Sequence, residues 1–362
     1  MQLTLEQWLA QPDVLLVVDT IQPPSGPMPK GQSATLKPKE LGLFLAITGA
    51  GKVYAFNGHV DLGTGIRTSL AQIVAEELYL QLDQVEMVLG DTERAPNQGA
   101  TIASATIQIS AVPLRNAAAE ARRHLLQLAS ERWQTPGEQL TLEDGVFTHP
   151  DGRQLAFGEL ITGGHVRLQI SGEAPLKPAS EYRLVGQGAA RVDIPAKATG
   201  ELTYVHDMRL PGMLHGRVIR PPYAGYDSGD FVGNSLLAVD ESSIADLPGI
   251  VAVVVIRDFV GVVAEREEQA IRAAQQLRIE WKPWQQKLPD LRDVAQAIRD
   301  NPRIARIVLD KGDVEQALKD ADQRLTRTYL WPYQLHASIG PSCALADYSE
   351  QHSRVWSGTQ NP

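Results

Sequence analysis

The feature that most constrains the fold is a glycine-rich turn that runs directly into an amphipathic helix, in residues 57–78. Gly58, Gly63 and Gly65 carry no Cβ, so this backbone can adopt positive φ and a ligand can approach its N–H groups. Apolar side chains recur at three- and four-residue spacings over residues 66–78, which predicts a helix with one apolar face. Because a helix start favours an oxyanion, the pattern indicates either a phosphate-binding turn or ordinary loop punctuation.

The first turn, residues 58–65, matches neither standard nucleotide motif. No Gly-Lys-Ser/Thr ending follows Gly63-Thr64-Gly65, and this run lacks the third glycine of a dinucleotide fingerprint. A nucleotide-binding dehydrogenase is therefore the weaker alternative.

A second turn, residues 101–106, has similar chemistry. It follows a predicted strand at 84–89 and leads into a long helix rich in Ala, Leu and Arg. The hydroxyls of Thr101, Ser104 and Thr106 lie on slim backbone that a ligand could approach closely. Two such turns around one β-α-β segment form a candidate binding site. The alternative is that the alanines only allow tight helix packing: Ala103, Ala105 and Ala111.

Composition indicates a soluble globular protein with a substantial core, because 43% of its 362 residues are hydrophobic and 21% are charged. The net charge is −9 and no block of Lys and Arg stands out, which argues against a nucleic-acid partner or an anionic membrane surface. Proteins and small molecules are the expected partners.

The single cysteine, Cys343, can form no intrachain disulfide and cannot by itself hold an iron–sulfur cluster. The N-terminal residues lack a basic region before their short apolar run, so they do not predict a signal peptide. No apolar run approaches membrane-spanning length, so we expect no membrane insertion and a cytoplasmic location. His206 and His215 have no metal-ligand spacing, and we predict no metal-binding residue.

The remaining chain alternates predicted elements with turns. Residues 21–39 are dense in Pro, Gly, Ser and Lys, so we predict an exposed arm there and a fold that begins after it. Apolar, Gly-bounded runs predict strands at 41–48, 52–56, within 250–263 and at 278–281, and strand-like chain over 324–362, including 329–333 and 353–357. Helices are predicted at 265–277, 290–300 and 313–322.

Three segments resemble the molybdopterin-binding large subunit of the xanthine dehydrogenase/aldehyde oxidase superfamily. The resemblance is stronger to its isoquinoline 1-oxidoreductase and nicotinate dehydrogenase-type branch. The most specific motifs occur in register in the family's a/b hammerhead module: Pro195–Gly200, Asp207–Leu214 and Arg217–Pro222. A second set of matches lies near the end of the chain: Tyr329, Pro332, Gln334, His336 and Ala337, then Trp356–Pro362.

The resemblance implies an α+β fold in which a partial molybdenum-binding domain precedes the a/b hammerhead domain and the first strands of a further molybdenum-binding domain. The expected divisions are an extended N-terminal arm at 1–40, the N-terminal molybdopterin-binding piece at 41–165, a linker at 166–190, the hammerhead at 191–285, and an apparently truncated further domain at 286–362.

The resemblance also implies a molybdopterin cofactor, as its cytosine dinucleotide or as the mononucleotide, bound by the two turns. The implied contacts are Gly63, Thr64 and Gly65 in the first turn, and Ala103, Ser104, Ala105 and Thr106 in the second. The implied reaction hydroxylates an aldehyde or an N-heterocycle with oxygen from water. Electrons would pass to [2Fe–2S] clusters on a small partner subunit.

Two departures bear on this resemblance. Many relatives carry glutamine where this chain has Thr64, and glutamate where it has Gly340. The family's general-base glutamate lies near the end of the full subunit, so no catalytic residue is assigned here and the isolated chain is expected to be inactive. Two hypotheses stay open: part of a hydroxylase completed by a C-terminal molybdenum-domain polypeptide, or an inert remnant without cofactor.

Overall fold

The computed structural model describes residues 3–24, 37–224, 232–285, 291–302 and 304–362. The chain divides into two compact units. The first unit is Met1–Met208 together with Ser342–Pro362, and the second is Arg209–Pro341. Residues 191–208 thus lie with the first unit, whereas the sequence suggested a boundary at Arg191.

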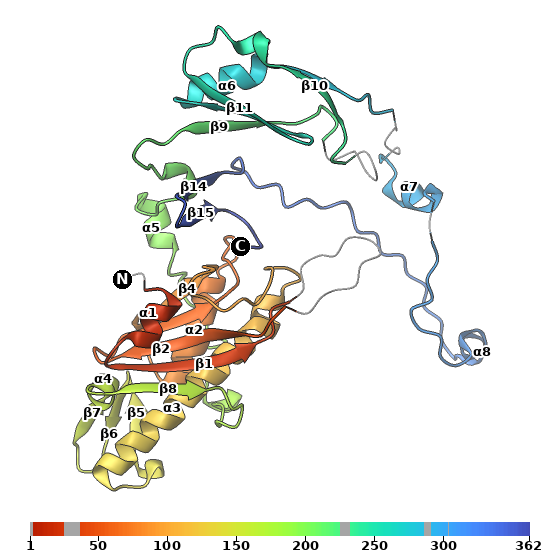
Figure 1. Cartoon of the computed structure of the whole chain (residues 1–362). Helices are drawn as coiled ribbons and strands as arrows, with labels where there is room; N and C mark the ends of the chain where they lie inside the picture. The colour runs from red at the N-terminus through yellow and green to blue at the C-terminus, as the bar shows by residue number, and fades with distance from the viewer. Residues whose placement is uncertain (1–2, 25–36, 225–231, 286–290, 303) are drawn as a thin grey trace. The chain divides into compact units, whose positions relative to one another are not determined.

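A five-stranded sheet organises the first unit (Figure 1). Its strands, in spatial order, are β4 (Val85–Leu89), β3 (Val53–Asn57), β2 (Glu40–Thr48), β1 (Val14–Ile21) and β8 (His165–Gln169). β2 pairs antiparallel with β1 and with β3, whereas β4 runs parallel to β3 and β8 runs parallel to β1. The predicted pair at 41–48 and 52–56 and the strand at 84–89 are confirmed.

The prediction that 1–40 is an arm outside the fold is wrong for its first half. Helix α1 (Leu5–Ala10) begins with a capping box at Thr4, and the first five residues of β1, Val14–Val18, are buried in the sheet. The run VLLVV shows no alternation because β1 is covered on both faces, which removes the usual sequence signature of a strand. The other residues predicted as arm, 25–36, lie outside the described part of the chain.

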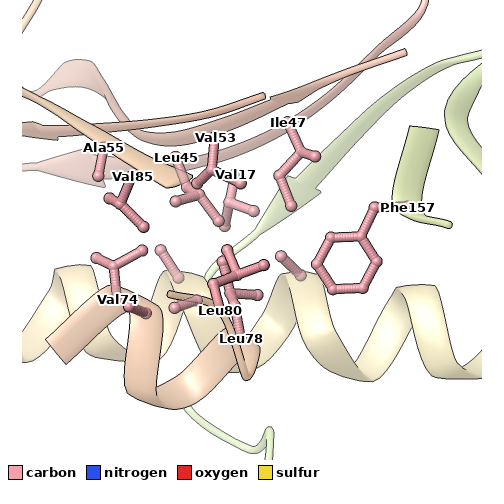
Figure 2. Packing of buried hydrophobic residues seen from close by; sticks show 14 of the residues in the cluster. Val17, Leu45, Ile47, Val53, Ala55, Val74, Leu78, Leu80, Val85 and Phe157 are labelled. Atoms are coloured by element: carbon pink, nitrogen blue, oxygen red, sulfur yellow. The ribbon is translucent and has the colours of Figure 1, made fainter. Parts of the chain in front are cut away.

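Two helices cover one face of this sheet. They are α2 (Ile66–Leu78), as predicted, and α3 (Ala111–Trp133). Figure 2 shows Val17 and Leu45 of the strands pointing toward Val74 and Leu78 of the helix side. The opposite face packs against Trp8 of α1. The loops of the candidate site follow β4, at one edge of this sheet, and its neighbour β3.

The predicted linker at 166–190 is instead part of the first unit. After a small sheet and one helical turn, the chain enters β8 and then packs against α2 and α3. The elements between α3 and β8 are the strands of the small sheet, β5 (Thr141–Glu143), β6 (Val146–Thr148) and β7 (Gln154–Ala156), and the helical turn α4 (Phe157–Ile161). Its Gly, Pro, Lys and Ser content suggested a spacer, but a buried ion pair and hydrogen bonds from its backbone to buried carboxylates fix this segment in place.

Two carboxylates of α2 hold that segment. Lys177 Nζ donates to Glu76 Oε1 at 2.5 Å, and both side chains are 2% exposed. Glu76 Oε2 also accepts the backbone N–H groups of residues 183–185. Glu77 accepts from Arg115 at 2.7 Å and Arg122 at 2.9 Å. A helix predicted as simply amphipathic thus buries two charges, each paired with cations.

The second unit is a smaller α+β module, as predicted for 250–281. Its larger sheet has the order β11 (Ile250–Ile256), β12 (Phe259–Ala264), β9 (His215–Ile219), all antiparallel. β10 (Leu236–Asp240) pairs with β13 (Arg278–Trp281). Helix α6 (Glu267–Gln276) buries Ala270 and Ala273 against the sheet. The short helices α7 (Val294–Asp300) and α8 (Val314–Asp320) follow.

The C-terminal residues return to the first unit as a hairpin of β14 (Ala344–Tyr348) and β15 (Ser353–Ser357). The strand expected at 353–357 is confirmed, but the one expected at 329–333 is wrong, since those residues are irregular and exposed. No helix among the described residues is long and apolar enough to cross a bilayer.

Candidate functional site

The first turn connects β3 to α2, and Gly63 and Gly65 take the positive φ values, 94° and 82°, that their lack of a Cβ permits. Their amides are not free. Asp61 Oδ1 accepts from Gly63 N at 2.9 Å and from Gly65 N at 3.2 Å, while Oδ2 accepts from Arg67 N at 3.0 Å. The chain's own carboxylate therefore takes the anion position at the start of α2.

The charge on Asp61 is stabilised by this arrangement. Burial opposes ionisation, but the amides of Arg67, Gly63 and Gly65 outweigh it and hold the pKa of Asp61 below its usual range. The carboxylate therefore remains ionised at neutral pH.

Arg191, from a distant part of the sequence, also contacts the first turn. Its Nη1 donates to Gly63 O at 2.8 Å, and a Cβ added to Gly65 would lie 3.3 Å from its side chain. Arg191 is in turn paired with Asp193 at 2.6 Å. Thr64, between the two glycines, stays exposed.

The second turn has the opposite character, because its central amides are free. Ala103 and Ser104 are both exposed and both have positive φ, 53° and 55°, which is unfavourable for residues with a Cβ. Among the described residues, neither of these two backbone N–H groups has an acceptor. Ala105 N donates within the turn, to Ile102 O at 3.0 Å. Two adjacent amides of exposed residues and the Ser104 hydroxyl are thus available to an anion.

His59 joins the two turns, and no sequence pattern had singled it out. Its ring is 1% exposed, with Nδ1 at 2.7 Å from Thr106 Oγ1 and Nε2 at 3.0 Å from Ser110 Oγ. Burial lowers the pKa of His59, so the ring is neutral at pH 7 and has one donor and one acceptor nitrogen for the two hydroxyls. The glycine pattern around it carried no signal that this imidazole turns inward.

Further hydrogen bonds join the end of β3, the loop after it and the loop after β4 to the second turn and to Ser110. Asn57 Nδ2 and Gln98 Nε2 both donate to Ser110 O, at 3.0 and 2.9 Å, and Val60 N donates to Thr101 Oγ1 at 2.9 Å. Ser110 ends a π-helical turn, Thr106–Ser110, that leads into α3. The loop after β3 and the second turn therefore form one hydrogen-bonded assembly.

The structure brings some predicted residues together and not others. Thr106 contacts the loop of the first turn through His59. Gly63 and Gly65 bind Asp61, and Gly63 also binds Arg191. Within the described residues, no hydrogen bond joins Gly63, Thr64 or Gly65 to the second turn. The same described residues contain no cluster of His, Cys, Asp and Glu that could hold a metal ion.

Two family models match this chain, and both describe a molybdopterin cofactor-binding domain. One covers residues 24–203, which include both turns, and the other covers 298–362. The chain belongs to the molybdopterin-binding proteins of the xanthine dehydrogenase superfamily.

Individual proteins similar to this chain include subunits of two oxidoreductases named for nicotinate and isoquinoline. A nicotinate dehydrogenase subunit of Pseudomonas putida is 72% identical over 357 residues, covering 99% of this chain and 30% of the relative. The beta subunit of isoquinoline 1-oxidoreductase from Brevundimonas diminuta is 32% identical, over 62% of this chain and 33% of the relative. The chain thus spans about a third of these relatives. A crystal structure of quinoline 2-oxidoreductase from Pseudomonas putida 86 is 30% identical over 32% of this chain and 15% of that chain, with a TM-score of 0.29.

Proposed function

We propose that this chain is the N-terminal part of the molybdopterin-binding subunit of a molybdenum hydroxylase that oxidises an N-heterocycle of the nicotinate type. The observation that carries the proposal is the 72% identity to a nicotinate dehydrogenase subunit along 99% of the chain. When bound, the cofactor supplies the redox chemistry, in which a ring carbon gains oxygen from water and loses two electrons.

The second turn fits an anionic part of such a cofactor and the first turn does not. The Ala103 and Ser104 amides are free and exposed, whereas those of Gly63 and Gly65 already bind Asp61, whose negative charge would repel a phosphate. We therefore propose that Ala103, Ser104 and the adjoining Ala105 and Thr106 carry the phosphate contact. The role of the first turn is to position the second through His59, with the exposed Thr64 as its free hydroxyl.

The other parts of the enzyme come from outside this chain. Four large apolar side chains near the second turn are 43–66% exposed: Ile102, Ile107, Ile109 and Val112. We propose that the C-terminal molybdenum-domain region of the subunit covers them and supplies the general-base glutamate, worth about 10²–10⁴-fold in rate. A small subunit with [2Fe–2S] clusters would take the electrons. The cytosine dinucleotide form of the cofactor and a cytoplasmic location are part of the same proposal.

Purification of the native complex through an affinity tag on this chain tests the proposal. We expect molybdenum in near-stoichiometric amount, iron, a C-terminal molybdenum-domain region in the same or a second polypeptide, and nicotinate-type N-heterocycle oxidation by the complex. Acid treatment should release a pterin with its nucleotide. A chain recovered alone, without molybdenum, pterin or partner, would instead support an inert remnant.

A further inference from the structure

The segment Trp356–Pro362 is a sequence signature to which the proposed function assigns no role. It lies in the first unit, and Gln360 contacts the second turn. Gln360 O accepts from Thr101 N at 2.8 Å, and Gln360 Nε2 donates to Thr101 O at 2.7 Å. A single residue, 259 positions away, thus satisfies both backbone polar groups of Thr101.

Control of the Thr101 carbonyl also controls the amide that follows it. The peptide unit is planar and trans, so a fixed carbonyl at Thr101 fixes the N–H of Ile102 in the opposite direction. This plane leads directly into the left-handed pair Ala103 and Ser104. Such conformations persist only where the surrounding structure determines them. Gln360 contacts the chain just before this pair, at Thr101, and His59 contacts it just after the pair, at Thr106.

Other interactions lie close to the contact between Thr101 and Gln360. Thr101 Oγ1 accepts from Val60 N, so three groups of Thr101 are engaged at once. The hairpin that precedes Gln360 also approaches the loop after β4, where Arg354 Nη2 lies 3.6 Å from Glu93 Oε2. The C-terminal segment is therefore attached to the first unit at two places around the second turn.

We propose that Gln360 is a positioning residue that holds the Ala103 and Ser104 amides in their anion-binding orientation by fixing the Thr101 peptide. The proposal rests on the proposed function, since it concerns the same phosphate contact. Gln360 does not touch the cofactor. It stabilises the second turn, which binds the cofactor. The conformation of that turn therefore depends on a residue outside its own sequence segment.

The test replaces Gln360 in the complete complex by methionine, which keeps the length of the side chain and loses its donor. The matched control is Gln351→Ala, which alters an exposed glutamine of the same hairpin. Two quantities are measured: the rate at which pterin leaves the complex, and hydrogen–deuterium exchange of residues 101–106 in the cofactor-free form. We expect both to rise about threefold to tenfold in Gln360→Met, as for loss of one hydrogen bond, and to stay unchanged in the control.

The outcomes separate this proposal from the one on which it rests. If the unaltered complex contains no pterin, the proposed function fails and Gln360 has no cofactor to position. If it contains pterin but Gln360→Met behaves like Gln351→Ala, only the present proposal is overturned. An exchange rate that rises equally throughout the first unit overturns it as well, because Gln360 would then be a general structural contact. An increase confined to 101–106, with an unchanged thermal midpoint, supports it.

Discussion

Replacement of Lys177 by methionine lowers the free energy of unfolding of the first unit by about 3–5 kcal/mol, because it leaves a buried carboxylate without its cation. Glu76 and Lys177 are each only 2% exposed, so water cannot solvate the charge that remains. The amides of residues 183–185 still donate to Glu76 and keep part of its stabilisation. Chemical denaturation of the variant, followed by tryptophan fluorescence, measures the change.

An exposed ion pair in the same unit provides the control. Lys52 and Glu86 are about half exposed, 52% and 49%, so Lys52→Met should change stability by less than about 1 kcal/mol. The double variant Lys177→Met/Glu76→Gln should regain part of the loss, since no unpaired charge remains. If Lys177→Met and Lys52→Met had equal effects, the packed segment after β8 would not depend on this pair.

Replacement of His59 by alanine lowers stability by about 2–4 kcal/mol, because the hydroxyls of Thr106 and Ser110 lose their buried partner. The same variant should also weaken pterin retention, since His59 joins the loop of the first turn to the second. Denaturant unfolding and pterin content measure the two effects. His352→Ala, at an exposed hairpin position, should be within about 0.5 kcal/mol of the unaltered protein.

The His59 effect depends on pH with a definite sign. Because burial lowers the pKa of His59 in the folded state, the unfolded chain binds the proton more readily. The stability from the neutral ring is therefore fully present above an unfolded-state pKa of about 6.5 and is lost as pH falls toward the folded-state value. The unaltered protein should lose this contribution on acidification below about pH 6.5, and His59→Ala should not. A similar acid profile for both proteins would contradict this assignment.

Local sequence patterns predicted α2 and the β2–β3 pair. α2 was predicted at its observed bounds because its apolar residues follow the helical period, and the β2–β3 pair because a Gly-Ala-Gly turn separates two apolar runs. β1 was missed because it is covered by α1 on one face and by α2 and α3 on the other, so its residues do not alternate. β2 is also buried on both faces, so its glycine-bounded apolar run identified it and alternation did not.

In the candidate site, some features follow from the local sequence and others depend on residues far away in the chain. The positive φ of Gly63 and Gly65 follows from residue type, and the exposure of the second turn fits its small residues. That Asp61 would take the amides of the first turn, and that His59 would face Thr106 and Ser110, depends on loop conformations that spacing does not determine. The tie between Thr101 and Gln360 depends on contacts made across most of the chain.

The central claim is that this chain binds molybdopterin at the second turn and not at the start of α2. An experimental density map of the native complex, at a resolution that resolves the pterin, tests it most directly. We predict a phosphate oxygen within hydrogen-bond distance of the Ala103 or Ser104 amide, with Asp61 still bound to Gly63 and Gly65. A phosphate seated on the amides of Gly63 and Gly65 with Asp61 displaced, or a complex without pterin, would contradict this claim.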